Sequence, residues 1–321
     1  MIPTRQGAKA GRAGDMYRLG KQFAAWLALI RLPFHSVGVL PFVLGLVLAW
    51  RLQRAWRWDV ALWGTLGVVL VMVATYCAGE YWDDAEDTLA GQMGRSRFSG
   101  GSGVLQRGLL PRRAALWASL AAVVLALGAA LVLYRGCGTG PWTIPFCAVG
   151  LLGGFFYSAR PVRWVSKGLG ELWIVFCYGW LPVAVGYYLQ VGSIAPVIHW
   201  LAVPIGLTIF NVILLNEFPD YPADRAAGKA NLTVRLGRRR AAVLYAAVAV
   251  ASWLGMLASL GHGVPGRALW LYLPVLAVSM LAVGLVLRGR WTRRTTLEKL
   301  CGATLLVNLG TTAVYILAYV R

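Results

Sequence analysis

Acidic side chains are the groups in this sequence best placed to do chemistry, because a chain of 321 residues carries only 12 Asp and Glu. Most of them gather in two clusters, and the first contains Glu80, Asp83, Asp84, Glu86 and Asp87. On a helix, Glu80, Asp83 and Asp87 share one face. Carboxylates held this close repel one another, so the first cluster calls for a cation.

The second cluster contains Asn216, Glu217, Asp220 and Asp224. Asn216, Asp220 and Asp224 repeat every four residues, which places their oxygen atoms along one stripe of a helix. Pro219 and Pro222 fall inside this stretch and are expected to distort or end the helix. The second cluster therefore offers a second set of oxygen ligands.

The ligand chemistry of both clusters favours Mg²⁺. Oxygen donors without a nearby His or Cys suit this hard cation, which keeps several waters and commonly bridges carboxylates to substrate phosphates. A single acidic run beside a membrane is more often a solvated loop. Two matched runs on the same membrane side favour a metal and phosphate site instead.

A basic segment that contains glycine follows each cluster. Arg97 lies in the first segment, and Arg225 and Lys229 lie in the second. Glycine lets backbone N–H groups approach phosphate oxygens, while Arg and Lys neutralise their charge. We therefore expect Arg97, Arg225 and Lys229 to bind a diphosphate.

A third polar segment contains Tyr157, Arg160, Arg163 and Lys167. It follows the fourth of the apolar segments described below, on the same predicted side as the acidic clusters. A role in membrane topology alone is the alternative interpretation for its three cations.

Hydrophobic residues make up 59% of the chain and charged residues 13%, which is far too apolar for a water-soluble domain. Nine apolar segments are each near the roughly 20 residues that a helix needs to cross a bilayer. They span 23–50, 60–78, 114–134, 142–157, 171–190, 197–215, 241–260, 269–287 and 300–319. The predicted fold is all-α and polytopic, with a basic N-terminal tail at residues 1–21 and one membrane domain at residues 22–321.

The net charge of +19 follows the predicted topology. Most Lys and Arg residues fall in the N-terminal tail and in the loops after the even-numbered helices, which places these parts in the cytoplasm. Nine helices then put the C-terminus outside, in a bacterial inner membrane. The charge is explained by topology, so we expect no nucleic-acid partner, and the sequence defines no oligomeric state.

These motifs resemble those of the UbiA-type intramembrane prenyltransferase superfamily, and the resemblance covers nearly the whole chain. Members carry an Asn-Asp-x-x-Asp-x-x-x-Asp motif after the second helix and an Asp-x-x-x-Asp motif after the sixth. The segment from Asp220 to Asp224 matches the second motif, and the residues around Lys229 continue the match.

The first motif departs from the family pattern. Gly79 stands in place of the usual Asn and Glu80 in place of the first Asp, while Asp83 and Asp87 are retained. Residues 98–105 resemble the branch that makes menaquinone precursors, in which a polyprenyl chain is transferred to dihydroxynaphthoate.

The resemblance implies nine helices around a central cavity, open sideways to lipid and capped by cytoplasmic loops. It implies a Mg²⁺-dependent transfer of an isoprenyl chain from a polyprenyl diphosphate to an aromatic acceptor. The implied metal ligands are Glu80, Asp83, Asp87, Asn216, Asp220 and Asp224. The implied catalytic residues are Tyr157, Arg160 and Lys167, and the first apolar segment, with Arg31 and His35, is expected to help place the acceptor.

Other functions remain open at this stage. A benzoate, a porphyrin-type ring or a glycerol lipid are alternative acceptors. A cation-coupled secondary transporter is the main rival from another class, since transporters also carry acids within the membrane. The change at Gly79 also leaves a catalytically silent member as an alternative.

Overall fold

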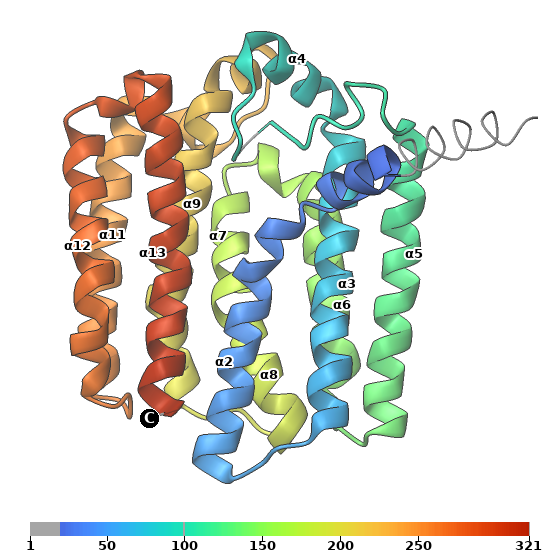
Figure 1. The fold of residues 1–321 in the computed structure, drawn as a ribbon, viewed down its shortest axis with the longest axis vertical. Coiled ribbons are helices and arrows are strands. Elements are labelled where there is room, and N and C mark those ends of the chain that lie inside the picture. The colour runs from blue at the N-terminus through green and yellow to red at the C-terminus, as the bar shows by residue number, and fades with distance from the viewer. Residues whose placement is uncertain (1–19, 99, 321) are drawn as a thin grey trace, which may run out of the picture.

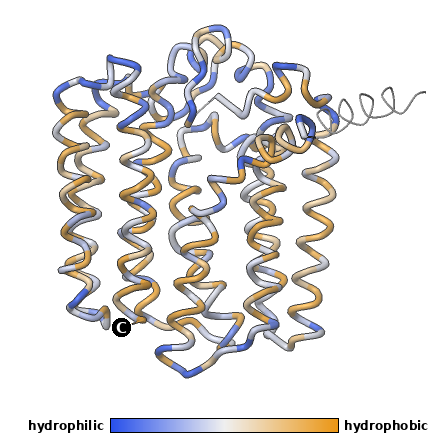
Figure 2. Tube along the Cα trace, viewed as in Figure 1, coloured by the Kyte–Doolittle hydropathy of each residue, from blue (hydrophilic) through white to orange (hydrophobic). Residues whose placement is uncertain are grey.

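The helices of this protein follow from its solvent, because only helices and closed barrels satisfy every backbone hydrogen bond within a bilayer. The computed structural model describes residues 20–98 and 100–320, and all regular structure in these two ranges is helical. The predicted basic tail at residues 1–21 lies almost wholly outside the described residues. Figure 2 shows apolar residues along the shafts of the helices and hydrophilic residues at both ends of the bundle.

Besides the helical residues 20–29, twelve α-helices make up most of the described chain, and five shorter 3₁₀ or π turns connect or interrupt them. The helices are α2 (Ser36–Gln53), α3 (Trp58–Trp82), α4 (Asp84–Gly94), α5 (Arg112–Leu131), α6 (Thr143–Ser158), α7 (Gly170–Ile174), α8 (Leu181–Val191), α9 (Val197–Ala226), α10 (Leu232–Leu236), α11 (Arg238–Leu260), α12 (Arg267–Leu287) and α13 (Arg294–Val320). The turns are η1 (Leu32–His35), η2 (Val132–Gly136), η3 (Trp164–Ser166), η4 (Val175–Trp180) and η5 (Arg290–Thr292).

Eight helices in the described ranges are long and apolar enough to cross a membrane, and α6 is a shorter apolar helix of 16 residues. The protein is therefore a polytopic membrane protein, as predicted, while the count of nine spans stays a prediction. The predicted helix over 171–190 consists of α7, the π turn η4 and α8 in sequence.

The first predicted helix is not continuous. Residues 20–29 are helical, Arg31 then adopts a left-handed conformation (φ 52°, ψ 46°), and η1 leads into α2. Pro33 lies in η1 and cannot donate a backbone hydrogen bond to the preceding turn. The interruption places Arg31 at a break in the helix.

The long helices run side by side in one bundle (Figure 1). α2 packs against α8 and α13, α9 packs against α11 and α13, and α3 packs against α5 and α6. The approach of α2 to α8 depends on Gly45 and Gly186, since a Cβ on either glycine would overlap the backbone of the other helix. Short α4 lies across one end of the bundle, here named the α4 end.

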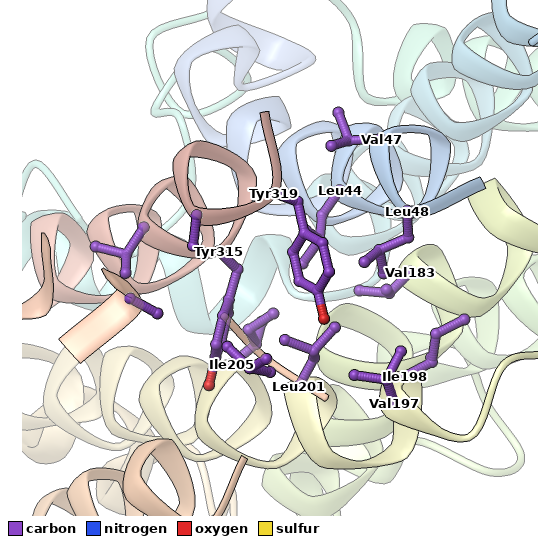
Figure 3. Close-up of a cluster of buried hydrophobic side chains, with 14 of the residues drawn as sticks. Leu44, Val47, Leu48, Val183, Val197, Ile198, Leu201, Ile205, Tyr315 and Tyr319 are labelled. Carbon is purple, nitrogen blue, oxygen red and sulfur yellow. The ribbon is translucent and has the colours of Figure 1, made fainter. Parts of the chain in front are cut away.

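A buried apolar cluster holds the bundle together at the end opposite α4 (Figure 3). Most of its side chains come from α2, α8, α9 and α13, with others from α11 and α12, and they include Leu44, Leu48, Val183, Leu201 and Tyr315. Lipid is as apolar as these side chains, so close packing rather than exclusion of water gives the contact its specificity.

Candidate active site

One cavity of about 340 Å³ occupies the space between α2, α3, α6, α8 and α9. Its wall follows α3 from Gly64 to Asp83, which corresponds to roughly 28 Å along the helix axis. All the charged residues on the wall, among the parts of the chain that are described, belong to the α4 end. They are Arg31, Glu80, Asp83, Asp87, Glu217, Asp220, Asp224 and Lys229.

The wall toward the opposite end is mostly apolar and contains small residues. It includes Gly67, Ala126, Ala130, Leu133, Phe146 and Leu189. A transporter needs a polar path that continues across the membrane, and this distribution of charge does not provide one. The shape and polarity suit an amphipathic molecule with a charged head and an apolar tail.

The first acidic cluster lies where α3 ends. The predicted single helix through the cluster is interrupted, because Asp83 caps α3 with non-helical dihedral angles and Asp84 begins α4. Asp83 Oδ2 accepts a hydrogen bond from Ser158 Oγ at 2.6 Å, and Asp83 Oδ1 lies 3.4 Å from an Arg163 guanidinium nitrogen. The interruption turns α4 across the mouth while Glu80, Asp83 and Asp87 all remain on the cavity wall.

Asp87 is a buried carboxylate of this cluster in the first turn of α4. Its side chain is 8% exposed and lies against the backbone of Gly101. Burial, together with the charges of Glu80 and Asp83, raises the pKa of Asp87 well above its ordinary value. A cation bound between these groups would stabilise the charged form.

The second acidic cluster lies on one unbroken helix. α9 runs through Pro219 and Pro222 to Ala226, so these prolines do not end it. Asn216, Asp220 and Asp224 all line the cavity, in keeping with their predicted spacing of four residues. The side-chain oxygen of Asn216 is buried and has no hydrogen-bond partner among residues 20–98 and 100–320.

The loop after α9 folds back onto Asp224. Asn231 Nδ2 donates to Asp224 Oδ2 at 2.7 Å, and Lys229 Nζ lies 3.5 Å from Asp224 Oδ1. Burial alone would lower the pKa of Lys229, but the carboxylates of Asp83 and Asp224 outweigh it and raise this pKa. Lys229 is therefore a fixed positive charge between the two acidic clusters.

Tyr157 and Arg31 complete the polar part of the wall. The Arg31 guanidinium lies 4.9 Å from the Phe34 ring centroid and 5.9 Å from that of Tyr76. Its NH2 group also donates to the carbonyl oxygen of Phe98 at 3.3 Å. Arg31 thus presents a cation beside aromatic rings, next to the acidic clusters.

Four cations expected at the site do not line the cavity: Arg97, Arg160, Lys167 and Arg225. Each is exposed in a loop or at a helix end around the α4 end. The topology interpretation accounts for their presence without any contact to the cavity. Their contact with a diphosphate stays a prediction.

Arg163 contacts the site, although the sequence analysis gave it no catalytic or binding role. It adopts a left-handed conformation (φ 49°) and forms ion pairs with Asp83 and Glu86. Its position shortly after Tyr157 and Ser158 identifies the third polar segment as part of the site. The sequence pattern alone does not show which cation of that segment, Arg160, Arg163 or Lys167, points toward the acidic clusters.

Glu171 and Glu217 are two further buried acids that sequence reasoning did not assign to the site. Glu171 Oε1 accepts from the backbone N–H of Leu232 at 2.9 Å, and Glu217 Oε2 accepts from that of Thr233 at 3.0 Å. These bonds anchor the segment that follows Lys229.

The donor set on the cavity wall suits a hard divalent cation. Four aspartates and the unpartnered oxygen of Asn216 supply only oxygen ligands. Within the described residues, no three His, Cys, Asp or Glu side chains form one compact metal cluster. Such an arrangement fits Mg²⁺ that takes its remaining ligands from water and phosphate.

An all-helical membrane bundle with charged groups at one end of an internal cavity defines the class of this protein as an intramembrane enzyme. The UbiA prenyltransferase family matches residues 38–309, and the chain belongs to this family. It is a prenyltransferase, which confirms the resemblance inferred from the two acidic motifs.

Named relatives point to one branch of the family. A 1,4-dihydroxy-2-naphthoate octaprenyltransferase from Escherichia coli is 26% identical over 80% of this chain and 82% of its own length. A 2-carboxy-1,4-naphthoquinone phytyltransferase from Synechocystis is 27% identical over 67% of this chain and 66% of its own.

Solved structures share the fold. A UbiA homologue from Archaeoglobus fulgidus, bound to DMAPP and Mg²⁺, is similar with a TM-score of 0.65 at 16% identity, covering 90% of this chain and 98% of its own. An apo UbiA homologue from Aeropyrum pernix gives a TM-score of 0.65 at 18% identity, covering 88% and 97%.

Proposed function

We propose that this protein transfers an isoprenyl chain from an allylic polyprenyl diphosphate to 1,4-dihydroxy-2-naphthoate, in a reaction that requires Mg²⁺. The observation that carries this proposal is the cavity of about 340 Å³, with two sets of carboxylates and a lysine at one end and an apolar wall toward the other. The relatives named as naphthoate and naphthoquinone prenyltransferases support this acceptor class.

The α4 end would bind the diphosphate. Asp83, Asp87, Asp220 and Asp224, with Asn216, would hold Mg²⁺, which supplies neutralisation of the charge that gathers on the leaving diphosphate. Lys229 adds a fixed positive charge between both acidic clusters, and its ion pair with Asp224 keeps the ammonium in place.

The apolar part of the cavity would hold the isoprenyl chain. The tail can then stay in a hydrocarbon environment while the diphosphate meets the polar groups, so no apolar surface has to enter water. Tyr157 lies on the wall beside the charged groups, where its π face would stabilise the allylic cation. The enclosing helices would exclude water, which otherwise captures that cation.

Arg31 is the group we assign to the acceptor. A guanidinium binds a carboxylate through two parallel hydrogen bonds, and dihydroxynaphthoate carries one carboxylate. The rings of Phe34 and Tyr76 beside Arg31 suit stacking of an aromatic acceptor. This placement sets the electron-rich ring carbon next to the allylic cation.

The proposed setting is a bacterial cytoplasmic membrane with the N-terminus and the α4 end in the cytoplasm. The partners are membrane lipid, the polyprenyl diphosphate and the aromatic acceptor. The basic loops near α4 follow the positive-inside pattern, which supports this orientation.

The test is release of diphosphate by purified protein in lipid vesicles, with an allylic diphosphate, a panel of acceptors, and Mg²⁺ present or chelated. We expect release to require both Mg²⁺ and dihydroxynaphthoate, together with formation of one prenylated naphthoate. Turnover with only a benzoate, a porphyrin-type ring or a glycerol lipid would overturn the acceptor assignment. Turnover in chelator would overturn the role of the metal.

A further inference from the structure

Glu80 occupies the position that the family pattern gives to a metal-binding aspartate, yet its carboxylate is already bonded within the protein. The side chain is 2% exposed. Ser102 donates to it twice, from its backbone N–H to Oε1 at 2.6 Å and from its Oγ to Oε2 at 2.8 Å. Both oxygens of Glu80 are therefore bonded to one residue of the loop at residues 100–103.

This loop, named here the glycine loop, touches both acidic clusters. Gly100, Gly101 and Gly103 all have positive φ angles, between 66° and 74°. A Cβ on Gly100 would lie 3.3 Å from Asp220 Oδ1, and a Cβ on Gly101 would overlap the carboxylate of Asp87. The loop backbone thus lies directly against one carboxylate from each cluster.

The position of the loop depends on a residue inside it, and Ser102 is that residue. It lies next to Gly101 and Gly103, and its Oγ also accepts from the backbone N–H of Val104 at 3.2 Å. Short hydrogen bonds to a carboxylate are stronger than those between neutral groups. A buried carboxylate held by two of them fixes the loop more firmly than glycines could by themselves.

The length of Glu80 fits this role. It lies in the last turn of α3, and the glutamate arm is one methylene longer than that of aspartate. The neighbouring Gly79 carries no side chain that could compete for the loop. A Cβ added at Gly79 would have Ser158 Oγ as its nearest neighbour, at 3.7 Å. The two departures from the family motif, Gly79 and Glu80, therefore lie where α3 is hydrogen-bonded to the glycine loop.

We propose that Glu80 is a positioning residue that holds the glycine loop against Asp87 and Asp220, and is not a ligand of the metal. The inference rests on the proposed function in one respect, namely that the site beside the loop binds Mg²⁺ and diphosphate. The two hydrogen bonds from Ser102 to Glu80 are present in the protein without ligands.

The experiment compares Glu80→Gln, Glu80→Ala and Ser102→Ala with the unmodified protein. Glutamine keeps both bonds, because its carbonyl oxygen accepts from the Ser102 N–H and its amide donates to Ser102 Oγ, but it carries no charge. Alanine at position 80 removes both bonds. The first measurement is trypsin cleavage after Arg97 and Arg107, which flank the glycine loop, in metal-free protein, relative to cleavage after the remote Arg288.

We expect cleavage beside the loop to rise about tenfold or more in Glu80→Ala, by less in Ser102→Ala, and hardly at all in Glu80→Gln. The second measurement is the Mg²⁺ concentration that gives half of the thermal stabilisation in the presence of inorganic diphosphate. It should stay within about threefold of the unmodified protein in Glu80→Gln and rise about tenfold or more in Asp83→Asn.

Two results would overturn the proposal. One is unchanged protection of the loop in both Glu80→Ala and Ser102→Ala. The other is a loss of Mg²⁺ binding in Glu80→Gln as large as that in Asp83→Asn. Ser102→Ala and Glu80→Gln keep the test decisive if Glu80→Ala does not fold. Neither measurement uses a prenyl acceptor, so failure of the proposed reaction would show separately, in the diphosphate-release assay.

Discussion

The two ends of the cavity differ in the interactions that shape their walls. At the α4 end, charged groups come from segments far apart in the chain and are held by ion pairs and hydrogen bonds, such as those of Asp83 and Asp224. Toward the opposite end, the wall consists mostly of small and apolar side chains, so its shape depends mainly on their size. We therefore expect changes at the α4 end to alter rate, and changes toward the opposite end to alter substrate length.

Asp220→Ala should produce the largest effect. Removing one carboxylate from the predicted metal site weakens stabilisation of the leaving diphosphate, and we expect turnover to fall by at least about 100-fold. Steady-state diphosphate release measures this. Glu298→Ala, an acidic change outside the cavity, should leave the rate unchanged. Full activity of Asp220→Ala would contradict the role of the second cluster.

Lys229→Ala should raise the KM for the diphosphate substrate by about 10–100-fold and affect the KM for the acceptor much less. The change removes a buried cation and leaves Asp224 without its ion pair. Arg239→Ala is the matched control, because Arg239 is exposed at the start of α11, does not line the cavity and should change either KM by less than about threefold. An effect confined to the acceptor would reverse the assignment of Lys229.

Gly67→Phe tests the apolar part. A Cβ at Gly67 meets nothing within 4 Å, and the residue lies on the cavity wall, so a phenylalanine ring would fill the space for the tail. The ratio of kcat/KM for a short over a long allylic diphosphate should rise about tenfold, as expected when several methylene groups lose their contacts. Gly128→Phe, on an exposed face of α5 with the same free space, should not change this ratio. An equal loss of kcat/KM for the short and the long substrate would show that the isoprenyl tail does not lie beside Gly67.

Arg31→Lys should give the smallest effect, a rise of several-fold in the acceptor KM. Lysine keeps the charge but lacks the planar fork that binds a carboxylate through two bonds. The KM for the diphosphate should stay nearly constant. A naphthalenediol without the carboxylate provides the check, since the variant and the unmodified protein should use it equally well.

The sequence was most informative where local spacing sets the geometry. The four-residue repeat of Asn216, Asp220 and Asp224 predicted a stripe on one helix, and α9 presents all three on the cavity wall. The expectation that Pro219 ends the helix was the wrong alternative, because the helix continues through it to Ala226.

Sequence reasoning was least informative where a loop decides which side chain turns inward. Arg160, Arg163 and Lys167 are close in sequence and identical in charge, yet only Arg163 pairs with Asp83. The partner of Glu80 was equally hidden, since Ser102 lies 22 positions away and is brought near by the fold of the connecting segment. Such contacts depend on the backbone path of a loop, which composition and periodicity do not encode.

The geometry of the glycine loop also limits which amino-acid substitutions the protein can tolerate there. Any replacement at Gly100 or Gly101 adds a side chain where the backbone has a positive φ angle and where the first carbon atom would meet Asp220 or Asp87. Missense changes at Gly101 should therefore score as null alleles in a saturation screen for prenyl transfer, and those at Gly100 as impaired ones. Gly108, with a similar φ angle but no neighbour within 4 Å, should accept asparagine.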